Sequence, residues 1–162
     1  FMGAGEVDAS GNVNATRLGP KPTGAGGFID ITTNAQHVVF CSSFTGGGLD
    51  CSFEDGKLHI NREGRITKFV NTLKQLSYNG KNAVAKHQKM HYVTERAVFE
   101  LRPEGLTLIE IAPGADLQKD ILDRMEFVPV ISPDLKEMDK ALFCSNGPFG
   151  LKDIMSNNKS DN

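Results

Sequence analysis

The segment with the clearest chemical potential is a glycine-rich loop, Gly24-Ala25-Gly26-Gly27-Phe28-Ile29-Asp30. Glycine takes positive φ angles without steric cost and lets a backbone approach a bound group closely. Bare backbone N–H groups in such a loop can hold an anion or stabilise an oxyanion. The loop therefore predicts an anion or oxyanion site, and the alternative for the isolated motif is a tight turn between two strands.

Two other kinds of site fit the sequence poorly. The Rossmann dinucleotide pattern needs a glycine two positions after Gly27, where this chain has Ile29. A zinc site is not expected either, because His87 and His91 are four residues apart but no third ligand stands at a recognisable spacing. His37 and His59 are interpreted as ordinary strand residues.

The residues around the loop predict mostly strands. Residues 2–8 and 12–17 flank Ala9-Ser10-Gly11 and predict a hairpin. Val38 to Ser42 is typical of a buried strand. Further strands are expected at 50–54 and 57–60, joined by Asp55-Gly56, at 66–70 after a similar Glu63-Gly64 turn, and at 91–94, 97–101 and 106–111.

Helices are expected to be few. Asp116 can cap a helix from about Leu117 to Met125, in which Leu117, Ile121, Leu122 and Met125 form an apolar stripe. Asp116, Asp120 and Asp123 then serve as the cap and as charges on a solvated face near the positive end of the helix dipole. Val130-Ile131 is expected to be a short extended piece, 134–142 a final helix, and 72–90 a surface connection.

Composition limits the class of protein. The chain has 162 residues and a formal net charge of −2, so one domain with a sizeable core is expected and no basic block suggests nucleic acid. No apolar run approaches the ~20 residues that span a bilayer. The three cysteines, without close pairing and without a signal-peptide pattern, favour reduced thiols in the cytoplasm or an organelle matrix. The start at Phe1-Met2 fits a processed terminus, a tag remnant or a cut inside a longer protein, and a hairpin arm that begins at residue 1 favours the cut.

Several motifs together resemble the family I CoA-transferases. The first set is Gly11-Asn12-Val13-Asn14, the glycine loop and Val38-Val39-Phe40. The second set is residues 93–101, Val-Thr-Glu-Arg-Ala-Val-Phe-Glu-Leu, followed by residues 105–114, Gly-Leu-Thr-Leu-Ile-Glu-Ile-Ala-Pro-Gly. The similarity is greatest to the propionate or acetate CoA-transferase branch and to its second, β-type half. It extends from residue 1 to about Asp139.

The resemblance implies an α/β fold of the NagB/RpiA/CoA-transferase type, with several β-hairpins and few helices. It implies transfer of CoA between a short-chain acyl-CoA and a carboxylate such as acetate. In the family, a glutamate attacks the thioester to give an acyl-glutamyl anhydride. CoA thiolate then converts the anhydride to a glutamyl-CoA thioester, which an incoming carboxylate resolves. A carboxylate is a weak nucleophile, so positioning and oxyanion stabilisation must compensate.

The family's nucleophile is not expected in this chain. The resemblance places it in a Glu-x-Gly motif a few dozen residues before the stretch that begins here. Only Glu54-Asp55-Gly56, Glu63-Gly64 and Glu104-Gly105 are similar to this motif. All three follow the glycine loop, whereas the family's motif precedes it. Each is interpreted as a solvated hairpin residue, so no catalytic residue is assigned here.

Gly26 and Gly27 match the family's glycine loop, which implies that their N–H groups hold the thioester oxygen or nearby CoA atoms. Asn14 falls in a family-like segment and its amide could donate to the same region, with a turn-capping amide as the alternative. Glu95 and Arg96 are adjacent and are expected on opposite faces of a strand. We interpret them as sheet-edge charges, and the alternative places one of them near the site entrance.

The resulting prediction is the C-terminal portion of a CoA-transferase β-type domain over 1–142, with a C-terminal tail at 143–162. CoA is expected as substrate, with no further cofactor and no metal. The expected partners are the missing N-terminal part of the same enzyme and further copies in a homo-oligomer, without nucleic acid or membrane. The 162-residue chain by itself is expected to have no CoA-transferase activity. The alternatives are a non-catalytic CoA-binding or assembly module of the same fold, or an acyl-CoA hydrolase.

Overall fold

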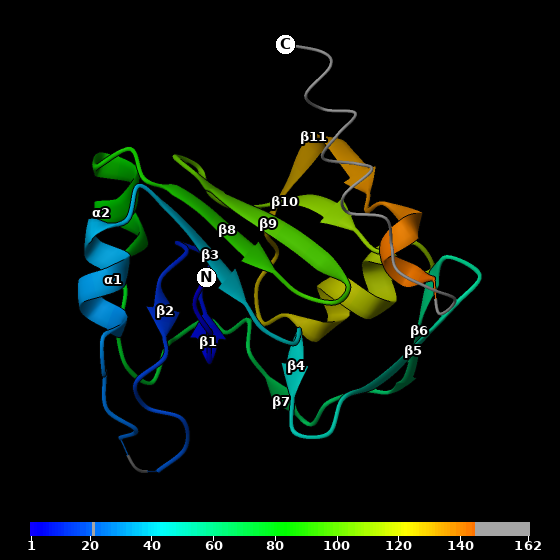
Figure 1. Cartoon of the computed structure of the whole chain (residues 1–162), viewed down its shortest axis with the longest axis horizontal. Coiled ribbons are helices and arrows are strands. Elements are labelled where there is room, and N and C mark those ends of the chain that lie inside the picture. The colour runs from blue at the N-terminus through cyan, green and yellow to red at the C-terminus, as the bar shows by residue number, and fades with distance from the viewer. Residues whose placement is uncertain (21, 145–162) are drawn as a thin grey trace.

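A five-stranded sheet forms the centre of the computed structural model, which describes residues 1–20 and 22–144 (Figure 1). The strand order is β11-β10-β9-β8-β3. β9 pairs in antiparallel with both β8 and β10, whereas β3 pairs with β8 and β11 with β10 in parallel. The bounds are β3 His37–Cys41, β8 Lys89–Val93, β9 Ala97–Arg102, β10 Gly105–Ile111 and β11 Val130–Glu137.

One face of this sheet carries the main core. Phe40, Tyr92, Phe99 and Leu108 stand on neighbouring strands and are buried together. Because side chains alternate across a strand, the period-two pattern of buried residues in β9 follows from its sequence. The strands predicted at 38–42, 91–94, 97–101 and 106–111 are confirmed within one or two residues.

Three small two-stranded sheets flank the centre: β1 (Glu6–Val7) with β2 (Val13–Asn14), β4 (Thr45–Gly46) with β7 (Ile66–Thr67), and β5 (Asp50–Glu54) with β6 (Lys57–Arg62). The hairpin around Gly11, at φ +70°, is confirmed, although its paired arms are only two residues long. The turn at Asp55-Gly56 is also confirmed, with both residues at positive φ.

The helices are short. They are α1 (Phe28–Asn34), α2 (Gly80–Ala85), a π-helical turn η1 (Leu117–Ile121) and the 3₁₀ turns η2 (Leu122–Arg124) and η3 (Lys140–Phe143). α1 and α2 lie together beside the sheet in Figure 1. Residues 72–90 were predicted as a surface connection, but they contain α2. The Asn79 side chain caps this helix by accepting a hydrogen bond from the Asn82 amide. Asp116 caps η1 as predicted, and Ile121 at the centre of the apolar stripe is fully buried.

Two predictions were wrong. The helix predicted over 134–142 is reduced to the 3₁₀ turn from Lys140, because β11 runs on to Glu137 and pairs with β10 past a bulge between Leu108 and Glu110. Glu63-Gly64 does not turn a hairpin, because β7 pairs with β4 and not with β6. In both cases pairing with a distant strand overrides the local signal.

The overall class is α/β with mostly strands, several hairpins and few helices, as predicted. Phe143 in η3 is buried beside Leu58 of β6, so packing continues to the end of the described residues. The tail predicted at 143–162 lies, from residue 145 on, outside them. No helix of the described residues is long and apolar enough to cross a membrane.

Candidate functional site

The glycine loop leads directly into α1. Gly24 and Gly26 take positive φ angles of +83° and +50°, and Gly27 is the residue before the helix. All three are exposed, and a Cβ at Gly24 or Gly26 would meet no atom within 4 Å. Gly24 and Gly26 therefore suit the backbone conformation and leave the space beside them open, whereas Gly27 has a φ of −86° that other residues also adopt.

The amides of Gly26 and Gly27 are available. Within the described residues, neither donates a hydrogen bond to the backbone or to a side chain, whereas the next amide, of Phe28, donates to the Ala25 carbonyl at 2.9 Å. The loop is held at its start, where the Thr23 amide donates to the Thr16 carbonyl at 2.8 Å. Two exposed donors in a tethered loop can hold an anion or an oxyanion without rearrangement.

Asn14, the other predicted site residue, is fully buried in β2. Its Nδ2 donates to Glu6 Oε2 at 2.7 Å and to the Arg17 carbonyl at 2.9 Å. Its Oδ1 accepts from the amides of Thr16 and Arg17 at 3.2 and 3.1 Å. Every polar atom of the side chain is used within the chain, which is the geometry of the turn-capping alternative.

Glu6 completes this cluster. Its carboxylate accepts from the Lys74 amide at 2.9 Å and pairs with Lys74 Nζ at 2.9 Å. Burial works against its ionisation, but the hydrogen bonds from Asn14 and Lys74 outweigh burial and hold the pKa of Glu6 below its usual range. The cluster therefore fixes the β1–β2 hairpin against residues 71–77, and the tether between Thr16 and Thr23 connects that hairpin to the glycine loop.

Arg96 is the feature that sequence reasoning placed wrongly. It is not a charge at a sheet edge but a fully buried side chain in the β8–β9 connection. Its guanidinium pairs with Glu63 at 2.7 Å and with Glu95 at 2.7 Å, and lies 5.0 Å from the ring centre of Phe44. The signal that could have found it is a Glu-Arg pair next to the apolar run from Ala97, where a charge needs partners.

Glu63 is a carboxylate partner of the buried Arg96 guanidinium. Burial opposes its ionisation, yet hydrogen bonds from Arg96 and Thr45 lower the pKa of Glu63 to about 2. Glu95 also accepts from the Phe44 amide at 2.9 Å. The interpretation of Glu63 as a solvated hairpin residue was therefore wrong, whereas Glu54 and Glu104 are exposed as expected.

The histidines form a pair that was not predicted. His37 Nε2 and His91 Nδ1 lie 2.8 Å apart on β3 and β8, and His87 is elsewhere, at the end of α2. Burial and the neighbouring His37 lower the pKa of His91. No group of three or more metal-binding side chains occurs in residues 1–20 and 22–144.

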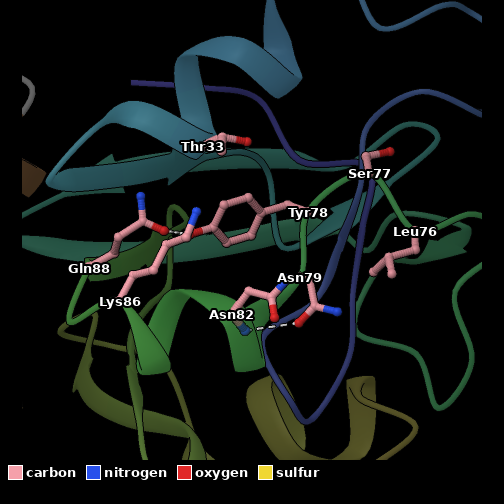
Figure 2. Close-up of a pocket in the computed structure, with 8 residues that line it drawn as sticks. All are labelled: Thr33, Leu76, Ser77, Tyr78, Asn79, Asn82, Lys86 and Gln88. Carbon is pink, nitrogen blue, oxygen red and sulfur yellow. Dashed lines mark hydrogen bonds between the residues drawn. The ribbon is translucent and has the colours of Figure 1, made fainter.

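A small pocket lies between α1 and α2, and Figure 2 shows its lining. Its volume is about 230 Å³, below the usual range of cofactor pockets. The Tyr78 hydroxyl donates to Gln88 Oε1 at 2.7 Å, and Gln88 Nε2 donates to the carbonyl of Thr32 at 3.0 Å. Burial raises the pKa of Tyr78 to about 12. These polar groups join the segments that flank α2 to each other and to α1, so we do not assign this pocket as the site.

Comparison with known proteins adds a close relationship. The chain is 50% identical over 143 residues to acetate CoA-transferase YdiF of Escherichia coli K12, covering 88% of this chain and 27% of that protein. It is 47% identical over 159 residues to caffeate CoA-transferase of Acetobacterium woodii, covering 95% of this chain and 30% of that protein. No protein-family profile matches.

A solved structure of one of these relatives has the same fold over the matched region. A crystal structure of YdiF from E. coli O157:H7 in a thioester complex with CoA superimposes with a TM-score of 0.87 at 50% identity, covering 88% of this chain and 28% of that one. The chain thus spans between a quarter and a third of the length of the relatives it matches.

Proposed function

We propose, from this chain's membership of the family I CoA-transferases, that it supplies the oxyanion side of an active site that moves CoA between a short-chain acyl-CoA and a carboxylate. The observation that carries the proposal is the open glycine loop, in which the Gly26 and Gly27 amides are exposed and unused by the described residues. A relative that is half identical over this region forms a thioester complex with CoA.

The chemistry follows from what those amides can do. When a nucleophile attacks a thioester carbonyl, negative charge collects on its oxygen, and two preorganised N–H donors stabilise that charge more than they stabilise the neutral carbonyl. The same donors serve each later step, because the anhydride and the glutamyl thioester pass through oxyanions of the same kind. The rate gain from one such donor is typically ~10²-fold or more.

The nucleophile of this proposal comes from outside the 162 residues. Glu63 is held by Arg96, and Glu54 and Glu104 lie at exposed turns away from the glycine loop in the chain. We therefore expect residues 1–142 to act as part of a larger catalytic domain and the 162-residue chain to show no turnover by itself. Water attack on the same thioester would give hydrolysis, so product analysis separates transfer from hydrolysis.

The test is a chimera in which residues of this chain replace the matched segment of E. coli YdiF. Because half of the matched positions are identical, we expect the chimera to fold and to transfer CoA from acetyl-CoA to propionate. The 162-residue chain assayed alongside should show no sustained transfer. A folded chimera that binds CoA but transfers none, or a turnover by the isolated chain, would contradict the proposal.

A further inference from the structure

We propose that the arginine pocket, lined by Gly47, Gly48, Arg62, Glu63 and Arg65, binds a phosphate group. The pocket has a volume of about 360 Å³ and lies where the β4–β7 pair meets the end of β6. Figure 1 shows β4 and β7 at the lower side of the molecule, the side on which α1 begins. The pocket is separate from the glycine loop, which contributes none of its lining.

The two arginines are held in place by the backbone. Arg62 Nε donates to the Gly48 carbonyl at 2.9 Å, and Arg65 Nε donates to the Gly47 carbonyl at 3.1 Å. Each guanidinium is thereby fixed through one nitrogen, while its terminal NH₂ groups stay available. Fixed arginine forks match the oxygens of phosphate in pairs, at a smaller entropy loss than free side chains would incur.

The tri-glycine turn makes this arrangement possible. Gly47 and Gly48 take φ angles of +75° and +101°, which side-chain-bearing residues rarely adopt. A Cβ at Gly47 would also come within 3.1 Å of the Ile66 side chain. Two successive left-handed residues turn both carbonyls toward the arginines, so the Gly46-Gly47-Gly48 segment has a role beyond reversing the chain.

The charge of the pocket is positive. Glu63 is its acidic member, and that carboxylate is occupied by Arg96 at 2.7 Å and flanked by Arg124 at 3.7 Å. Among residues 1–20 and 22–144, no carboxylate lies within ion-pair distance of Arg62 or Arg65. Two arginines held beside one cavity without a carboxylate of their own favour an anion between them.

Phosphate can reach this pocket from two sources. CoA carries a diphosphate bridge and a phosphate ester on its ribose, and in this form the inference rests on the proposed function. Free phosphate or diphosphate offers the same oxygens without that dependence. The two sources are distinguished by measuring both ligands on the same variants.

The experiment is calorimetric titration of the 162-residue chain with pyrophosphate and with CoA at low ionic strength, where surface electrostatics are strongest. The variant is R62Q/R65Q, and the control is K57Q/K119Q, which removes the same charge from exposed lysines outside the pocket. A second variant, R62K/R65K, keeps the charge but loses the fork. Circular dichroism checks that each variant is folded.

We expect R62Q/R65Q to lower the affinity for both ligands by roughly tenfold or more, R62K/R65K by less, and the control by under about twofold. If pyrophosphate binds with this pattern and CoA does not bind, the site is confirmed and its ligand is free phosphate or diphosphate, whereas the chimera assay tests the proposed function separately. CoA binding that R62Q/R65Q leaves unchanged would overturn the inference and leave the proposed function standing. A parent chain that does not bind pyrophosphate also overturns it.

Discussion

Arg96 and Glu63 lie 33 positions apart in the sequence and form a 2.7 Å ion pair in which the arginine side chain is fully buried. The pair joins the β8–β9 connection to the segment between β6 and β7. Arg96 also donates to the Asp120 carbonyl at 3.1 Å, which ties η1 to the same point. One buried cation therefore holds together three segments that no continuous sheet connects.

Removing the carboxylate should destabilise the chain. Glu63→Gln leaves a buried guanidinium with Glu95 as its remaining charged partner, and we expect a loss of about 2 to 4 kcal/mol in the free energy of unfolding. Urea denaturation measures this. Glu54→Gln, at the exposed β5–β6 turn, is the matched control and should change stability by less than about 0.5 kcal/mol. Equal effects for the two variants would show that the pair is not stabilising.

The same carboxylate should make stability depend on acid pH. The pKa of Glu63 is about 2 in the folded chain against an ordinary 4.5, so its contribution to stability is complete above the unfolded pKa. This stabilisation is lost as the pH falls from the unfolded pKa of 4.5 to the folded pKa of about 2, because the unfolded chain takes up the proton first. We expect a loss of about 2 kcal/mol, smaller than the full shift implies because the group is partly solvated. Urea midpoints between neutral pH and pH ~2 should fall less steeply in Glu63→Gln than in the parent.

Gly27 offers a test of the glycine loop that does not disturb the fold. Its φ of −86° suits alanine, and an added Cβ would lie 3.4 Å from the Ile31 side chain, an ordinary contact. Gly27→Ala should therefore leave the thermal midpoint of the YdiF chimera nearly unchanged. If a thioester approaches this backbone, the methyl group should lower kcat/KM at least ~tenfold. Gly3→Ala is the control and should keep full activity, because a Cβ at Gly3 would meet no atom within 4 Å and Gly3 has no positive φ.

Gly26 should respond differently. At φ +50°, an alanine is strained, so Gly26→Ala should destabilise the chimera by about 1 kcal/mol as well as reduce its activity. The thermal midpoints of Gly26→Ala and Gly27→Ala report the backbone strain, and their kcat/KM values report how far the added methyl group blocks the substrate. A Gly26→Ala variant that loses stability but keeps activity would show that the substrate does not approach this residue.

Asn14 should prove structural. Asn14→Ala removes two donated hydrogen bonds and leaves Glu6 partly unsatisfied in a buried place, with an expected cost of about 2 kcal/mol. In the chimera, assayed well below its thermal midpoint, KM for acetyl-CoA should change by less than about twofold. A large rise in KM with unchanged stability would instead place the Asn14 amide in contact with substrate.

The sequence by itself determined the features that depend on neighbouring residues. Asp55-Gly56 needs two residues at positive φ wherever it occurs in a tight hairpin, and the structure has both. The alternation in Ala97 to Leu101 fixes which side chains face the core, and the Asp116 cap depends on an amide three residues away. The glycine loop was recognised from its own composition and from the motifs around it.

Tertiary structure decided everything that depends on distant partners. The residues after Asp134 have no strong local strand signal, and they become strand because β10 presents an edge for parallel pairing. Glu63 resembles a turn residue until Arg96 is brought beside it, and the partners of the Asn14 amide, Glu6 and the Arg17 carbonyl, are set by the fold of the hairpin. A buried charge or amide is defined by the groups that satisfy it, and those groups come together only when the chain has folded.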